Sequence, residues 1–208
     1  MQIAQEFALT IERPIRECLG SAYAYRYEKD RQITDLSTAQ EHFQFALAMA
    51  RASKDRLAEQ AILGNLVNFY LIQQSLDMAI ECGLQAIDLH QYFDNPLEHS
   101  NALGNLGAVY CQKGQELQQI GDNLEAEEQI NRGIEYLLKS LNISVDLDEL
   151  SNQVWMHCNI AEAYSISARI EKGKEHLDLA ETTIKKINPS DVRLEQRLQS
   201  LQEQFKNI

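Results

Sequence analysis

Residues 105–110 read Asn-Leu-Gly-Ala-Val-Tyr, and this stretch decides the fold because variants of it recur along the chain. The matching stretches are Cys-Leu-Gly-Ser-Ala-Tyr ending at Tyr23, Asn-Leu-Val-Asn-Phe-Tyr ending at Tyr70, and Asn-Ile-Ala-Glu-Ala-Tyr ending at Tyr164. In each of them an aliphatic residue precedes the tyrosine by four positions, a spacing that places both on one side of an α-helix. The sequence therefore predicts four equivalent helices.

A second segment follows each of these stretches and carries two small residues seven positions apart. The pairs are Ala39 and Ala46, Ala79 and Ala86, Gly133 and Ser140, and Gly173 and Ala180. Small residues on one face allow a second helix to pack closely and antiparallel against the first. One such hairpin cannot bury both of its faces, so neighbouring hairpins are expected to stack into a solenoid.

These residues resemble the tetratricopeptide repeat (TPR). Leu106-Gly107-Ala108-Val109-Tyr110 matches the first half of its signature, and the segment from Ala79 to Ala86 matches the second half with Gly83 in place of an aromatic. Successive second segments are 40, 54 and 40 residues apart. The 40-residue period is similar to the longer repeats of kinesin light chain, LGN-type scaffolds and bacterial MalT or Rap regulators. The resemblance implies an all-α, right-handed α-solenoid of about four helix hairpins with a C-terminal capping helix.

The predicted organisation is a single domain over residues 1–208. Repeats are expected at about 14–54, 57–93, 96–147 and 150–188, with turn signals at 94–96 and 188–191. Pro14 is expected in the first turn of the first helix. Ser37 is expected to begin a capping box at the start of the second helix. The capping helix is expected over 191–208, where spacings of four and three residues separate its apolar positions: Leu194, Leu198, Leu201, Phe205 and Ile208. The alternative for that helix is a dimerising heptad.

The third repeat carries an insertion of fourteen residues between its two signatures. Apolar spacing continues through the insertion, and Gly121-Asp122-Asn123 supplies a turn. We therefore predict a hairpin that is extended by about two turns in each helix. It is strongly acidic, and we call Glu125, Glu127 and Glu128 the acidic arm. The arm acts either as a spacer or as a contact for a particular partner.

The net charge of −12 comes entirely from the middle of the chain. Residues 57–149 contain fifteen acids against three bases, whereas the flanking segments are balanced. Such a surface disfavours nucleic acid and anionic membranes, so it indicates either solubility or a basic partner protein. No apolar run reaches the roughly 20 residues of a membrane span. The absence of a secretory signal and of any paired cysteines favours the cytoplasm.

Motifs for catalysis are missing: the chain has no phosphate-binding glycine loop, no nucleophile elbow and no zinc-protease motif. His157 and Cys158 are adjacent, so they leave a helix in different directions and make a poor metal pair. We predict no enzyme activity, no cofactor and no metal.

The resemblance places the residue before each signature aliphatic in a concave groove, where it would contact a bound peptide. That position is Cys18, Asn65, Asn105 and Asn159, and the amides of the three asparagines both donate and accept hydrogen bonds. Further groove residues by the same reasoning are Asn68, Gln112 and Glu162, with Trp155 and Tyr25 as exposed aromatics. The first helices of the second, third and fourth repeats carry no groove-facing Lys or Arg, which predicts a neutral groove. The alternative role for these asparagines is to join neighbouring repeats.

The predicted function is a non-enzymatic adaptor that binds a peptide or partner protein in this groove. Two other classes stay open. One is a regulatory sensor that responds to a peptide or small ligand, and the other is an assembly chaperone for a larger complex. A monomer is slightly favoured over an oligomer.

Overall fold

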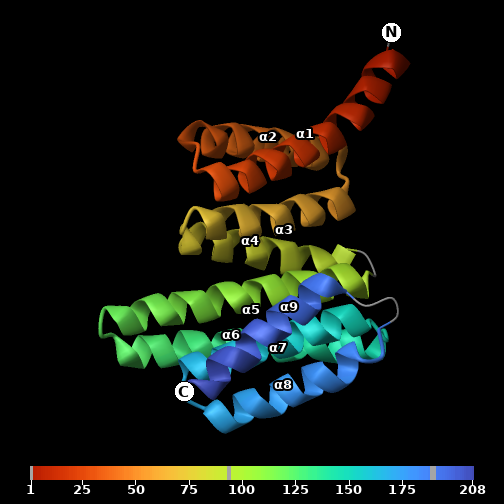
Figure 1. The fold of residues 1–208 in the computed structure, drawn as a ribbon. Coiled ribbons are helices and arrows are strands. Elements are labelled where there is room, and N and C mark those ends of the chain that lie inside the picture. The colour runs from red at the N-terminus through yellow and green to blue at the C-terminus, as the bar shows by residue number, and fades with distance from the viewer. Residues whose placement is uncertain (1, 93–94, 188–190) are drawn as a thin grey trace. The chain divides into compact units, whose positions relative to one another are not determined.

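The computed structural model describes residues 2–92, 95–187 and 191–208, and it describes side chains from residue 11 onward. These residues form nine α-helices and one short 3-10 helix, and none of them forms a strand (Figure 1). The elements are α1 (Gln2–Asp30), α2 (Ile33–Ser53), α3 (Arg56–Ile72), α4 (Leu76–Asp88), η1 (Leu89–Tyr92), α5 (Pro96–Gln119), α6 (Asn123–Asp146), α7 (Leu150–Ile166), α8 (Ile170–Ile184) and α9 (Val192–Lys206). None of the described helices is both long and apolar enough to span a bilayer.

Consecutive helices pair as hairpins: α1 with α2, α3 with α4, α5 with α6, and α7 with α8. The chain divides into two compact units, residues 1–95 and 96–208, and each is described by itself. Each unit contains two of the predicted repeats, and α9 belongs to the second unit. The all-α repeat class is confirmed, whereas a single domain over 1–208 stays a prediction. The turn residues predicted at 94 and at 188–190 lie outside the described residues.

The small residues predicted to line each hairpin are buried, and α5 and α6 approach each other very closely. A Cβ on Gly107 would lie 2.8 Å from the backbone oxygen of Gly133, and a Cβ on Gly133 would lie 2.7 Å from that of Gly107. Both distances are below ordinary van der Waals contact. The two helices therefore touch backbone to backbone, and only glycine fits at either position.

Two predictions for the first repeat are wrong. Helix α1 begins at Gln2, so Pro14 lies inside a 29-residue helix instead of in its first turn. Proline in a helix costs one backbone hydrogen bond but does not necessarily end the helix. Ser37 also lies inside a helix, because α2 already begins at Ile33. Its hydroxyl donates 2.9 Å back to the carbonyl of Thr34, a bond typical of serine within a helix.

The predicted extended hairpin is confirmed, since α5 and α6 each contain 24 residues whereas α3 and α7 contain 17. Gly121 adopts a φ of +86° in the turn, a conformation that favours glycine. Asp122 caps α6 by accepting a hydrogen bond from the backbone N–H of Glu125. Farther along, Gly114 faces the backbone of Ala126 and the side chain of Ile130, so the two extended helices remain tightly packed.

Helix α9 packs on the last hairpin, as the prediction of a capping helix requires. Four of its predicted apolar positions are buried in one cluster with residues of α7 and α8: Leu194, Leu198, Leu201 and Phe205. The ring of Phe205 lies directly over Gly173 of α8. Ile208 follows the end of α9 and is exposed, so including it in the apolar face was wrong.

Candidate binding groove

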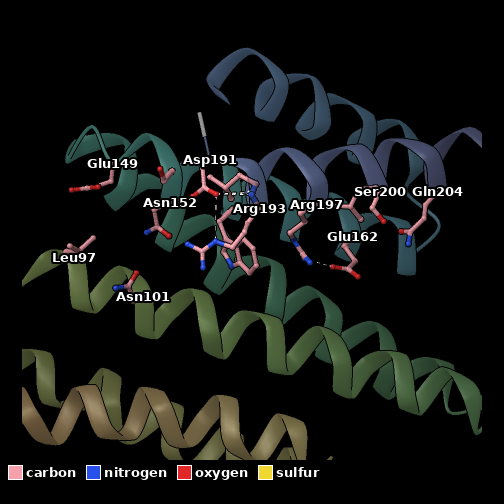
Figure 2. Close-up of a pocket in the computed structure, with 14 residues that line it drawn as sticks. Leu97, Asn101, Glu149, Asn152, Glu162, Asp191, Arg193, Arg197, Ser200 and Gln204 are labelled. Carbon is pink, nitrogen blue, oxygen red and sulfur yellow. Dashed lines mark hydrogen bonds and ion pairs between the residues drawn. The ribbon is translucent and has the colours of Figure 1, made fainter. Parts of the chain in front are cut away.

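A groove of about 730 Å³ opens within the second unit, between α5, α7 and α9 (Figure 2). Leu97 and Asn101 of α5 line one side, and Trp155 of α7 also lines the groove. A polar row on α9 lines the other side: Arg193, Arg197, Ser200 and Gln204. These four residues are spaced by four, three and four positions, which places them on one face of the helix.

The start of α9 is fixed at the edge of this groove by Asp191. Its carboxylate accepts hydrogen bonds from the backbone N–H groups of Arg193, at 3.0 Å, and of Leu194, at 3.4 Å. This is the usual work of a helix N-cap, and it sets where the polar row begins. Asp191 itself lines the groove together with Glu149 of the loop before α7.

Arg197 joins α9 to the groove-facing residues of α7. Its guanidinium lies over the ring of Trp155, 4.6 Å from the centroid, and donates to Asn159 Oδ1 at 2.7 Å and to Glu162 at 2.9 Å. Trp155 keeps 40% of its surface exposed, so one part of the ring contacts arginine while another part remains open to the groove. The hydrogen bonds to Asn159 and Glu162 fix the guanidinium in place, and its position over the ring restricts the orientation of the indole.

These contacts correct the prediction of a neutral groove. The first helices indeed supply no cation, but α9 brings Arg193 and Arg197 to the groove, where Arg193 lies beside Asp191 and Arg197 pairs with Glu162. The spacing of apolar residues in α9 identified only its buried face and its role as a cap. Its polar face lies along the groove, so the groove has cations on one wall and carboxylates nearby.

No protein-family model matches the chain, and no curated protein matches it in sequence. Solved structures do match it. BtubC (BKLC) from P. vanneervenii is 16% identical with a TM-score of 0.60, and the match covers 83% of this chain and 65% of that one. Two crystal structures of nearly identical TPR-like repeats from Podosopora anserina match at 15% identity. The first has a TM-score of 0.60, and the match covers 92% of this chain and 95% of that one. The second, a form with one substituted residue, has a TM-score of 0.61, and the match covers 92% of this chain and 94% of that one.

The chain has the TPR-like repeat fold. Its hairpins are therefore TPR-like repeats, and the first helix of each corresponds to α1, α3, α5 and α7. The match to BtubC spans less than two thirds of that chain.

Two of the three predicted groove asparagines are bonded to a neighbouring helix of the solenoid, one to α1 and one to the capping helix α9. In the first unit, the side-chain amide of Asn65 donates to Glu17 of α1 at 2.8 Å. Burial raises the pKa of Glu17, although the charge of Arg13 and this hydrogen bond oppose the shift. In the second unit, Asn159 accepts from Arg197. The Asn65 contact corresponds to the alternative role of joining repeats, whereas the Asn159 contact joins the last repeat to the capping helix; the binding role stays a prediction.

The remaining predicted groove residues lie in different places. Asn105 and Gln112 are half-buried on α5, and the side chain of Asn105 makes no hydrogen bond to another described residue. Asn68 is exposed on α3, and Tyr25 is 60% exposed on α1 with Lys29 over its ring. The structure thus brings together Trp155, Asn159 and Glu162 around one groove, which the other predicted residues do not line.

The acidic arm lies at the start of α6 in the extended hairpin. Glu127 and Glu128 are exposed, and Glu128 forms an ion pair with Arg132 at 3.0 Å. Glu125 is half-buried and accepts a hydrogen bond from Gln129. Two of the three carboxylates therefore face solvent, as predicted, and the third is partly shielded.

A buried serine network beside the groove was not predicted. The hydroxyl of Ser100 on α5 lies 2.9 Å from the backbone oxygen of Ser140 and 2.9 Å from the hydroxyl of Ser144, both on α6. The amide of Asn152 on α7 donates to Ser144 at 2.8 Å. The network ties three helices together and leaves Asn152 at the groove. The sequence signal for this network was Ser140, which stands at a position where the other repeats have alanine.

A second unpredicted feature is the contact between His157 of α7 and His176 of α8. Their Nδ1 atoms lie 2.9 Å apart, so one neutral ring donates to the other. Burial, helped by the neighbouring ring, lowers the pKa of His157 to about 4. Burial also lowers the pKa of His176. Among the described residues, no three potential ligands come close enough to hold a metal ion.

Three cysteine thiols are buried and free. Burial raises the pKa of Cys82 to about 11, of Cys111 to about 12 and of Cys158 to about 11. A thiol reacts as its thiolate, so these three groups are poor nucleophiles at neutral pH. They serve as small core residues in the packing of the TPR-like hairpins.

Proposed function

We propose that this protein is a non-enzymatic interaction scaffold that binds a peptide segment of a partner protein in the groove between α5, α7 and α9. The observation that carries the proposal is Trp155, a large aromatic that is 40% exposed in an open groove and held in orientation by Arg197. Exposed, immobilised aromatics beside polar groups are typical of binding hot spots. The TPR-like fold supports the scaffold role.

The groove offers complementary contacts for an extended or helical peptide. Leu97 and the open part of Trp155 provide an apolar site for one anchoring side chain. Asn101 makes no side-chain hydrogen bond to another described residue, so its amide is available to the peptide main chain. Arg193 is almost fully exposed at the groove edge, where it would meet a carboxylate.

We also propose a cytoplasmic location and a partner with a basic surface. The free, buried thiols suit a reducing compartment. The excess of fifteen acids over three bases in residues 57–149 favours a basic partner by simple attraction.

Peptides selected from a random library displayed on phage test the groove. Trp155→Ala should weaken the affinity of the selected peptides by about 30-fold, which corresponds to the roughly 2 kcal/mol of a binding hot spot. Tyr92→Ala is the matched control, because Tyr92 is an exposed aromatic of the first unit. Circular dichroism would confirm that both variants fold. Equal affinities for wild type and Trp155→Ala would contradict the proposed groove.

A further inference from the structure

The turn of the extended α5–α6 hairpin carries two aliphatic side chains that are almost fully exposed. Ile120 lies just before Gly121 and is 78% exposed, and Leu124 lies in the first turn of α6 and is 84% exposed. Turns at the surface are normally polar, because exposed apolar side chains gain nothing from folding. Neither side chain belongs to a described core cluster. The pair contributes nothing to the folding of the hairpin, so both side chains are available for contact with another molecule.

The hairpin that carries this pair is well ordered up to its end. A Cβ on Gly114 would run into the side chain of Ile130, so the two helices pack closely near the tip. Asp122 caps α6, and the backbone N–H of Asp122 donates to the carbonyl of Leu117 at 3.0 Å. A surface that is already ordered loses little entropy when it binds, which favours affinity.

The surroundings of the pair are acidic. Residues 115–131, which we call the hairpin tip, contain five carboxylates and no Lys or Arg. Glu116, Asp122, Glu127 and Glu128 are exposed there. Arg132 follows the hairpin tip, but it is paired with Glu128 and lies over the ring of Tyr110. Arg169 also reaches the hairpin tip, where it donates to Asn131 at 2.8 Å. Five carboxylates against these two guanidinium groups still leave a net negative charge around the exposed aliphatic pair.

We propose that the hairpin tip is a second docking surface, distinct from the groove, for a partner protein whose surface has an apolar pocket with Lys and Arg around it. Ile120 and Leu124 enter the pocket, and the surrounding carboxylates meet the basic rim. Charge complementarity selects this occupant. Anionic membranes and nucleic acids are repelled by the same carboxylates. A second hairpin tip of this chain is repelled for the same reason.

The test uses the full chain with the photo-crosslinking residue benzoylphenylalanine at position 124. Position 179 is the matched control, because Leu179 of α8 is an exposed aliphatic outside the hairpin. After irradiation in lysate, the crosslinked protein is identified by mass spectrometry, its crosslink is mapped, and it is purified for affinity measurements. We expect a crosslink from position 124 alone, to an apolar site flanked by Lys or Arg.

The affinity of that purified protein decides the question. I120S/L124S should weaken binding at least tenfold, whereas Leu179→Ser should leave it unchanged. Glu116→Gln with Glu127→Gln should slow association, as should added salt, because exposed charges act mainly on the association rate. Trp155→Ala should have no effect, so a failure of the groove proposal is distinguishable from a failure here.

Several outcomes would overturn the proposal. One is equal crosslinking from positions 124 and 179. Another is a crosslink from position 124 to a second copy of this chain, to nucleic acid, or to a neutral or acidic protein surface. The third is an unchanged affinity of the I120S/L124S variant for the crosslinked protein. All substituted side chains in the hairpin tip are exposed, so circular dichroism and the melting temperature should match those of the wild type.

Discussion

Acid should destabilise the second unit through His157, beginning as the pH falls below 6.5. Burial beside His176 lowers the pKa of His157 to about 4 in the folded protein, whereas an unfolded histidine has a pKa of 6.5. The unfolded chain therefore binds the proton more tightly. The stability that the neutral ring provides is complete above pH 6.5 and is lost as the pH falls toward 4.

The size of the effect follows from the two pKa values. A difference of one unit corresponds to about 1.36 kcal/mol, so full linkage gives a loss of about 2 kcal/mol at pH 5. Partial solvent screening of the ring reduces the expected loss to about 1–2 kcal/mol. His176, whose pKa is also lowered, adds to the loss in the same direction.

Urea unfolding between pH 5 and 7.5, followed by tryptophan fluorescence, measures this loss. The only tryptophan of the chain is Trp155, so the signal reports on the second unit alone. The matched variant His157→Gln cannot titrate, and its dependence on pH should be flatter by about 1–2 kcal/mol over that range. An identical dependence on pH in the wild type and in His157→Gln would refute the argument.

Gly107→Val should destabilise the protein by about 3 kcal/mol, because the new side chain would clash with the backbone of Gly133. Gly64→Ala has open space at its Cβ and should stabilise the protein by about 0.5–1 kcal/mol. Chemical denaturation of both variants measures these opposite changes. Deleting residues 191–208 should expose the apolar cluster under α9, so light scattering should detect aggregation, and a soluble, equally stable truncation would contradict the cap. Asn101→Ala should lower the affinity for a groove peptide by about 1–3 kcal/mol in calorimetry with an unchanged melting temperature, whereas a collapse of stability alone would assign Asn101 to folding.

The repeat architecture could be predicted because its determinants are local. Leu106 and Tyr110 share one helix face, and Gly133 and Ser140 share another, so a spacing in the sequence directly encodes a contact surface. The extended hairpin was predictable for the same reason, because an insertion with continuing apolar spacing must lengthen both helices.

The groove could be predicted only in part. Trp155 and Glu162 were assigned from the sequence, and they do line it. Arg197 was missed because its role depends on how α9 lies across α7, which no spacing along the chain encodes. The pairing of His157 with His176 was missed likewise, since residues 19 positions apart meet only when two helices pack.

The central claim is that a partner peptide binds over Trp155, and fluorescence titration tests it most directly. A peptide selected from a random library, lacking tryptophan, would be added to the wild-type protein while the emission of Trp155 is recorded. We predict a saturable shift of the emission to shorter wavelength, since the bound peptide excludes water from the exposed part of the indole. Its midpoint should equal the dissociation constant from calorimetry. Binding that is clear in calorimetry but leaves the emission of Trp155 unchanged would contradict the account.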